Sequence, residues 1–283
     1  MFEQLFSWFK RTQKRWLYGL LSLSLVISFG LVTPQPSYGI SWLELILRGV
    51  QTYQVCNMSQ QQEISLGQRI NQQIKSQVRI SRNRPLTRYI NQIGRRLAAN
   101  SERPDLPYTF QVVDDDQINA FATLGGFVFV NTGLVKAAAN EAELASVIGH
   151  EIGHVEKRHG VSQLCSRARN SAILSATGLD ENTAANLGVE ILFNLPYSRD
   201  HELQADQIGL DFLQESGYAP VGMVSFMETL MSQGGASPPS FLSTHPATSD
   251  RIQALRAQID PRTANVGDGL NNRSYRRYVR SLL

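Results

Sequence analysis

Two histidines stand four positions apart in the run 150–154, which reads His-Glu-Ile-Gly-His. Apolar residues recur at helical spacing through residues 140–159, so this run is predicted to be a helix packed into a core. On that helix His150 and His154 lie one turn apart on the same side, where their imidazoles can hold one metal ion. Glu151 lies about 100° around the helix, close enough to reach a water on the metal without joining the ligands. The pattern is typical of a zinc peptidase, although five such residues also occur by chance in ordinary helices.

A catalytic zinc site needs a third protein ligand and an open position for water. The run 197–206, YSRDHELQAD, offers Glu202 and Asp206, which stand one helical turn apart. Glu202 can ligate the metal while Asp206 accepts the outer N–H of a ligating histidine. Taken alone, such a pair is more often an ordinary surface pair. The metal motif upstream favours the active-site interpretation.

Three other residues are candidates for the third ligand. Glu190 and His201 are weaker candidates because neither has a supporting partner like Asp206. His159 lies one position too early for a metzincin and, on an unbroken helix, points about 140° away from His154. That subclass is therefore excluded unless the helix breaks before His159.

The run 243–252, STHPATSDRI, supplies two more candidates. Pro246 is predicted to start a helix. His245, just before it, either donates to the oxyanion of the tetrahedral intermediate or binds the metal in a closed resting state. A loop or capping role is the simpler alternative. Arg251 is placed to pair with Glu202 or Asp206.

A small sheet is predicted before the metal helix. Residues 108–113 and 126–130 have the composition of short strands, with a turn at 114–117. In zinc peptidases of this organisation, an edge strand beside the metal pairs with the main chain of the substrate. We expect Phe127–Val130 to be that edge strand, and an ordinary core strand is the alternative. The candidate substrate-binding residues are Asn119, Gly126, Phe127 and Val128.

The remaining segments read mainly as helices. Apolar residues at helical spacing predict helices at 64–78 and 86–97, an amphipathic helix within 40–63, and a helical pair at 161–196. Cys56 and Cys165 form either a disulfide, as an oxidising compartment permits, or two buried thiols. Neither cysteine is spaced as a metal pair.

The first 39 residues have the order of a secretory leader. Basic residues precede an apolar run at 16–32, and small residues at 37 and 39 precede a candidate cleavage point. An uncleaved membrane anchor is the alternative. Without the leader, basic and acidic residues balance, so nothing indicates nucleic acid as a partner. Either form places the catalytic part outside the cytoplasm.

The motifs HEIGH, SRDHELQAD and STHPATSDRI, preceded by INAFATLGGFVFVNTGLV, resemble the family of Ste-type CAAX prenyl proteases, HtpX and BepA-like zinc metallopeptidases. The resemblance covers about residues 64–259 and is specific because order and spacing agree. It implies a zincin-like (gluzincin) α+β fold, mainly α, with a small β-sheet beside the HExxH helix. By matching position it implies one Zn²⁺ per chain, held by His150, His154 and Glu202. Glu151 would be the base and acid, Asp206 would orient the site, and His245 and Arg251 would match the family's active-site His and Arg.

The resemblance also has limits. Integral-membrane branches of this family have several spanning helices, whereas this chain has at most one. The BepA branch carries a tetratricopeptide array after the protease domain, whereas here only a polar, basic tail follows. We therefore expect four parts: a signal peptide or anchor at 1–39, an amphipathic helix at 40–63, a peptidase domain at 64–260 and a tail at 261–283.

These features predict an exported metalloendopeptidase, in the periplasm or on the extracytoplasmic face of a membrane, with peripheral or single-anchor membrane association. Its expected substrates are unfolded or misassembled envelope proteins, by analogy with quality-control proteases. The rival hypothesis is a chaperone-like binder of unfolded envelope proteins with a latched or inactive zinc site. The intact Glu151 argues against that rival.

Overall fold

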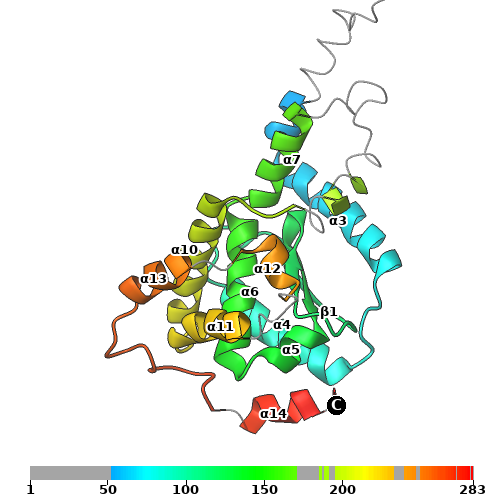
Figure 1. The fold of residues 1–283 in the computed structure, drawn as a ribbon. Helices are drawn as coiled ribbons and strands as arrows, with labels where there is room; N and C mark the ends of the chain where they lie inside the picture. Colours follow the sequence, from blue (N-terminus) through cyan, green and yellow to red (C-terminus); the bar gives the residue numbers. More distant parts are fainter. Residues whose placement is uncertain are drawn as a thin grey trace, which may run out of the picture. The chain divides into compact units, whose positions relative to one another are not determined.

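The computed structural model describes residues 52–170, 185–186, 188–190, 195–232, 239–246, 249–271, 273–280 and 282, and its elements are labelled as in Figure 1. All of these belong to one unit, Arg48–Leu283, while the other unit is Met1–Leu47. The predicted leader at 1–39, the first part of the predicted helix at 40–63 and most of 171–194 lie outside the described residues. None of the described helices has the length and apolar content needed to cross a bilayer.

Three short strands form the sheet: β1 (Thr109–Val113), β2 (Ala120–Ala122) and β3 (Phe127–Asn131). Their order is β1-β3-β2, with β1 parallel and β2 antiparallel to β3. The central strand β3 is buried at every position, which accounts for its continuous apolar sequence. The 3₁₀ turn η1 (Leu124–Gly126) joins β2 to β3 through Gly125 and Gly126, whose φ angles of 74° and 91° favour glycine.

Two helices precede the sheet. α3 (Gln60–Gln77) begins at a capping box in which the Gln62 N–H donates to Ser59 Oγ and the Ser59 N–H donates to Gln62 Oε1. α4 (Arg84–Ala98) begins after Asn83, whose Oδ1 accepts from the Leu86 N–H. The apolar face of α4 packs against β1, and α3 packs against η1. Both helices lie close to the predicted ranges.

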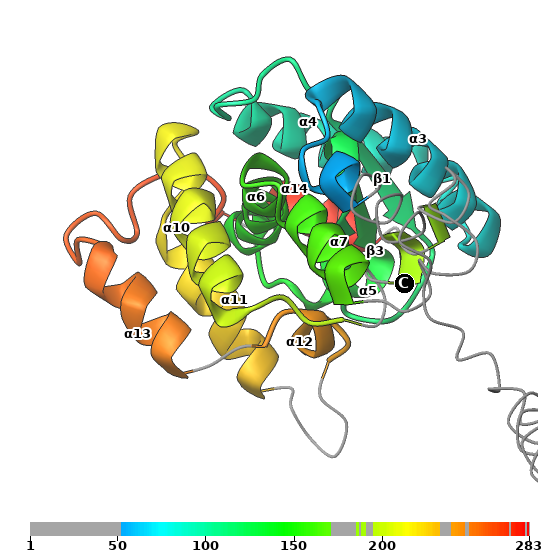
Figure 2. The same cartoon turned by 90° about the horizontal axis from the view of Figure 1, so that it is seen from above.

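The metal-motif helix is α6 (Glu141–Glu156), and it is the central helix of the domain (Figures 1 and 2). Asn140 Oδ1 accepts from the Glu143 N–H at 3.0 Å and begins the helix. The sequence predicted one broad apolar stripe, but α6 is buried on every side. α10 (Arg199–Glu215), α11 (Val221–Ser232), α4 and the sheet all pack against it. A helix covered on every side needs small residues where its neighbours come close.

Glycines on α6 meet small residues on α10. A Cβ added to Gly153 would lie 2.9 Å from the carbonyl oxygen of Ala205, and one added to Gly149 would lie 3.2 Å from that of Gly209. In the reverse direction, a Cβ on Gly209 would lie 2.9 Å from the backbone nitrogen of His150. The two helix backbones are therefore nearly in contact beside the metal motif.

The remaining helices are α5 (Thr132–Ala137), α7 (His159–Asn170), α12 (Phe241–Thr244), α13 (Ser249–Gln258) and α14 (Arg273–Arg280). The segment that the sequence set apart as a tail packs onto the domain, because Tyr275 of α14 is buried and its hydroxyl donates to the Val135 carbonyl. The predicted fold class, α+β and mainly α with a small sheet beside the metal helix, is confirmed.

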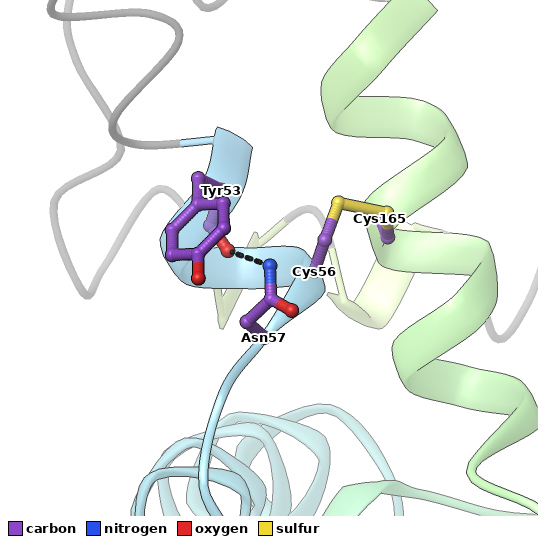
Figure 3. The surroundings of a disulfide bond; sticks show 4 residues. All are labelled: Tyr53, Cys56, Asn57 and Cys165. Atoms are coloured by element: carbon purple, nitrogen blue, oxygen red, sulfur yellow. Dashed lines mark hydrogen bonds between the residues drawn. A yellow bond between two sulfur atoms is a disulfide. The ribbon is translucent and has the colours of Figure 1, made fainter.

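A disulfide joins Cys56, at the end of a short helical segment, to Cys165 of α7 (Figure 3). The bond closes a loop across a sequence separation of 109 residues. A loop of this length restricts the unfolded chain and stabilises the fold by about 5 kcal/mol in the chain-entropy estimate. The pairing holds the N-terminal segment against the helix that follows α6.

The α6–α10 contact can be tested by adding one methyl group. We expect Gly153→Ala to lower the free energy of unfolding by roughly 1–3 kcal/mol, because the new Cβ meets backbone that cannot move aside cheaply. Urea unfolding followed by circular dichroism measures the change. Gly160→Ala in α7 is the matched control, because its Cβ would meet only the Leu124 side chain, at 3.1 Å. Equal destabilisation by both variants would contradict this account of the contact.

Candidate metal centre

His150 and His154 bring two imidazoles together on α6. Both side chains are buried, and their Nε2 atoms lie 3.0 Å apart. This is the arrangement that a spacing of four residues predicts on a helix. Burial lowers the pKa of His154 well below its ordinary value, which favours the neutral imidazole that metal binding requires.

Glu202 comes from the first turn of α10. That turn is fixed by Ser198, whose Oγ accepts from the His201 N–H at 3.2 Å. Glu202 Oε1 lies 3.4 Å from His154 Nε2, and Oε2 lies 3.7 Å from His150 Nε2. Burial alone would raise the pKa of Glu202, but His245, His154 and His150 together hold it far below its usual value. The carboxylate is therefore ionised, as a metal ligand must be.

His245 lies directly after α12 and completes a group of four. Its Nδ1 lies 3.3 Å from His150 Nε2 and 3.0 Å from Glu202 Oε1. Its ring stacks on Phe241 at 4.5 Å between centroids. One ligand atom from each of His150, His154, Glu202 and His245 lies within 4.8 Å of the others.

This donor set fits a divalent metal ion. In a tetrahedral zinc site with bonds of about 2.1 Å, neighbouring ligand atoms are roughly 3.4 Å apart. Five of the six separations lie between 3.0 and 3.7 Å, and all six lie within 4.8 Å. Three imidazole nitrogens and one carboxylate are also the ligand types that zinc prefers.

Glu151 lies beside this group but outside it. Its side chain is fully buried, and its Oε1 lies 3.4 Å from His245 Nε2. Burial raises the pKa of Glu151, and the nearby His245 and His150 oppose that rise. A buried carboxylate with a raised pKa is suited to taking and returning a proton.

Arg251 of α13 compensates the buried acids. Its Nε and Nη2 donate to Asp206 at 2.7 Å each, and its Nη1 lies 2.5 Å from Glu202 Oε2. Asp206 Oδ1 in turn lies 3.0 Å from His150 Nδ1. Burial would raise the pKa of Asp206, but these bonds from Arg251 and His150 hold it below its usual value. The pair Arg251–Asp206 thus orients one imidazole of the group.

The sequence profile of peptidase family M48 matches residues 85–259, which is more than half of the chain and includes every residue of the group. The chain belongs to peptidase family M48. The family resemblance drawn from the motifs is thereby confirmed.

Several curated proteins are also similar to this chain. The beta-barrel assembly-enhancing protease of Escherichia coli (strain K12) is 32% identical over 210 residues, covering 69% of this chain and 43% of that protein. The metalloprotease YcaL of the same strain is 32% identical over 160 residues, covering 54% of this chain and 63% of YcaL. A mitochondrial metalloendopeptidase of Arabidopsis thaliana is 34% identical over 161 residues, covering 56% of this chain and 33% of that protein. The chain thus spans less than half the length of the assembly-enhancing protease that it matches.

The prediction that Phe127–Val130 is an edge strand is wrong. Phe127–Val130 lies in β3, the central strand, which is hydrogen-bonded on both sides, so its backbone is not free to bind a peptide. Gly126 leads into that strand, and Phe127 and Val128 are buried in the core. Asn119 lies just before β2, and its carbonyl accepts from the Asn131 N–H. Within the described residues β2 forms the sheet edge that packs on α6.

The weaker third-ligand candidates lie outside the group. Glu190 is exposed and pairs with Arg167 at 3.1 Å. His201 is not part of the group of four and stacks on His159 at 4.1 Å between ring centroids. The structure therefore brings Glu202, and neither of these, to the α6 histidines.

His159 has a role that the sequence interpretation missed. Its Nδ1 lies 2.9 Å from His154 Nδ1, and its Nε2 lies 3.0 Å from Gln204 Oε1. If His154 uses Nε2 for a metal, its Nδ1–H must donate to His159, so His159 Nε2–H donates to Gln204. The chain of hydrogen bonds then fixes a single tautomer for both rings. The geometry arises because α6 ends at Glu156, before His159.

An ion pair between Arg158 and a buried glutamate holds that break. Arg158 has a φ of 56°, which is uncommon for a residue with a side chain. Its Nε donates to the buried Glu63 at 2.9 Å, and its Nη2 donates to the Met58 carbonyl at 2.6 Å. The N-terminal region therefore fixes the turn that points His159 toward His154.

We expect His159→Ala to weaken zinc binding roughly 10- to 100-fold, because His154 loses the acceptor that orients it. Competition with a chelating dye measures the affinity directly, without an activity assay. His201→Asn is the matched control, because the His201 side chain stacks on His159 but is not one of the four residues of the group. An unchanged zinc affinity in His159→Ala, with the fold intact, would contradict the orienting role.

Proposed function

We propose that this M48 protein is a zinc-dependent metalloendopeptidase whose metal is held by His150, His154 and Glu202. The observation that carries the proposal is the buried Glu151 carboxylate beside three converging ligand side chains. The names of the related proteins, two of them metalloproteases and one an assembly-enhancing protease, support the same activity. The leader in the sequence and the Cys56–Cys165 disulfide support export to the periplasm or the outer face of a membrane.

The residues divide the chemical work. When bound, zinc would polarise the scissile carbonyl and lower the pKa of a water molecule. Glu151 takes the proton of the attacking water and returns it to the leaving nitrogen, a task that its raised pKa favours. Asp206 and His159 hold the two α6 imidazoles in the tautomers that leave Nε2 free.

The position of His245 supports a closed resting state. Its Nδ1 lies 3.0 Å from Glu202 Oε1 and 3.3 Å from His150 Nε2, so His245 would be a fourth ligand of a bound zinc ion, and its Nε2 lies 3.4 Å from Glu151 Oε1. In that position His245 takes the place that water or substrate needs. We propose that His245 in this position keeps the protease inactive. When a substrate enters, His245 moves away and catalysis begins.

Unfolded or misassembled envelope proteins are the proposed substrates, as the name of the assembly-enhancing relative suggests. β2 is the better strand to pair with their main chain, because it forms the edge beside α6. A small pocket next to His154, lined by residues of the β2–η1 segment and by Tyr197, adjoins it. Because hydrogen bonds to the main chain do not depend on side chains, pairing at this edge would admit substrates of many different sequences.

The role of Glu151 can be tested by removing its charge alone. We expect Glu151→Gln to lose casein cleavage by a factor of at least about 10³ while binding one zinc per chain, because the base is lost and the ligands remain. Cleavage assays with zinc analysis of the same samples measure both. Glu215→Gln, at the exposed end of α10, is the charge-matched control. Retained cleavage in Glu151→Gln would refute the mechanism.

Removal of the His245 side chain tests the closed state. We expect His245→Ala to cleave casein roughly tenfold faster, as follows if about nine in ten molecules are closed at rest. The double variant Glu151→Gln/His245→Ala should lose that gain. A loss of roughly 10²–10³-fold in His245→Ala would instead assign His245 to oxyanion stabilisation.

A further inference from the structure

The C-terminal helix α14 is fixed along α4. Its buried Tyr275 bonds to the Val135 carbonyl, and Tyr278 stacks on Tyr89 of α4 with ring centroids 4.0 Å apart. Leu282, just beyond α14, borders the same hollow as Arg82 and Asn83, at the start of α4. Contacts at Tyr89 and at Leu282 therefore bring α14 beside α4.

Arginines cover the outer sides of both helices. On α14 they stand at helical spacing i, i+3, i+4 and i+7, and on α4 they line an open hollow along the helix. All eight are exposed, and we call them the arginine face: Arg82, Arg84, Arg88, Arg95, Arg273, Arg276, Arg277 and Arg280. Residues 79–100 and 269–283, which contain them, include no Asp or Glu.

Over the described residues, the arginine face has no internal ion pairs, although Arg82 at its edge borders a hollow that Asp114, Asp115 and Asp116 also line. Within the part of the chain that the structure describes, none of its eight guanidinium groups forms an ion pair or hydrogen bond. Neighbouring basic residues do have partners: Arg79 pairs with Asp114, Arg96 with Asp268, and Lys136 with Asp116. Clustered like charges repel one another, so such a surface is stabilised by an anionic partner.

We infer that the arginine face binds the phosphate groups of an anionic phospholipid membrane. Guanidinium groups bind phosphate oxygens in pairs, and arginine is favoured over lysine for this purpose. Two adjacent helix faces spread the charges over an area, which suits the many headgroups of a bilayer better than one small anion. If it is retained as an anchor, the apolar run at 16–32 would also hold the chain at a membrane.

This surface is separate from the metal centre. The ligand group is built from α6, α10 and the residue after α12, whereas the arginine face is built from α4, α14 and the residues before α4. Binding to a membrane through the arginine face therefore does not use the catalytic residues. The inference consequently stands or falls independently of the proposed protease activity.

Sedimentation of the full chain with lipid vesicles tests the inference. Vesicles of phosphatidylcholine alone measure any insertion through the N-terminal residues, and vesicles that also contain phosphatidylglycerol measure the added effect of anionic lipid. We expect stronger binding to the anionic vesicles. Raising the NaCl concentration from roughly 0.1 to 1 M should remove the excess, because the Debye length falls from about 10 to 3 Å.

Two triple variants separate this surface from net charge. Each arginine near an anionic bilayer strengthens binding roughly fivefold, so Arg84→Gln/Arg88→Gln/Arg277→Gln should reduce the excess binding by more than about tenfold. The control Lys75→Gln/Arg256→Gln/Arg262→Gln removes the same charge elsewhere and should keep the excess. Casein cleavage should be the same in both variants and the wild type.

Three results would overturn the inference. Equal binding of the wild type to both vesicle types would show that anionic lipid is not recognised. Equal loss in the two triple variants would show that only net charge matters. Retention on heparin without excess binding to anionic vesicles would assign the arginine face to another kind of polyanion.

Discussion

The metal centre depends on how closely α6 and α10 approach each other. Gly149 and Gly153 leave room for the backbone of α10, and a Cβ on Gly209 would already meet the backbone nitrogen of His150 at 2.9 Å. Only at this separation does Glu202 reach within 3.4 Å of His154 Nε2. The ligands therefore sit on two rigid helices, whose packing sets the geometry more tightly than loops would.

Close packing also buries charge, and Arg251 compensates it. Two carboxylates, Glu202 and Asp206, would be strongly destabilising here without a cation, because an unpaired buried charge costs several kcal/mol. Arg251 contacts both and is itself only 2% exposed. Because Asp206 also contacts His150, the same pairing that stabilises the acids orients a ligand. Stability and metal binding are thus coupled through one guanidinium group.

The spacing of residues in the sequence predicted those features of the site that depend on a single helix. His150 and His154 stand one turn apart on one helix, and so do Glu202 and Asp206. Spacing along a helix alone therefore predicted that the two members of each pair share a face. Strand order and the His159 contact depend on distant segments. The prediction that Phe127–Val130 is an edge strand was wrong, and its unbroken apolar sequence is typical of a central strand. The turn before His159 is held by the ion pair between Arg158 and Glu63, which no local pattern reveals.

Tyr89 connects the metal helix α6 to the arginine face. The Tyr89 ring stacks on Tyr278 of α14. The Tyr89 hydroxyl donates to Glu141 Oε2, in the first turn of α6, at 2.5 Å. Tyr218 donates to the other oxygen of Glu141 at 3.0 Å. These contacts pass through packed helices and not through a flexible linker. A domain held to a membrane by the arginine face would therefore keep its catalytic groups at a fixed orientation to the bilayer, which restricts cleavage to chain segments that can reach them from that side.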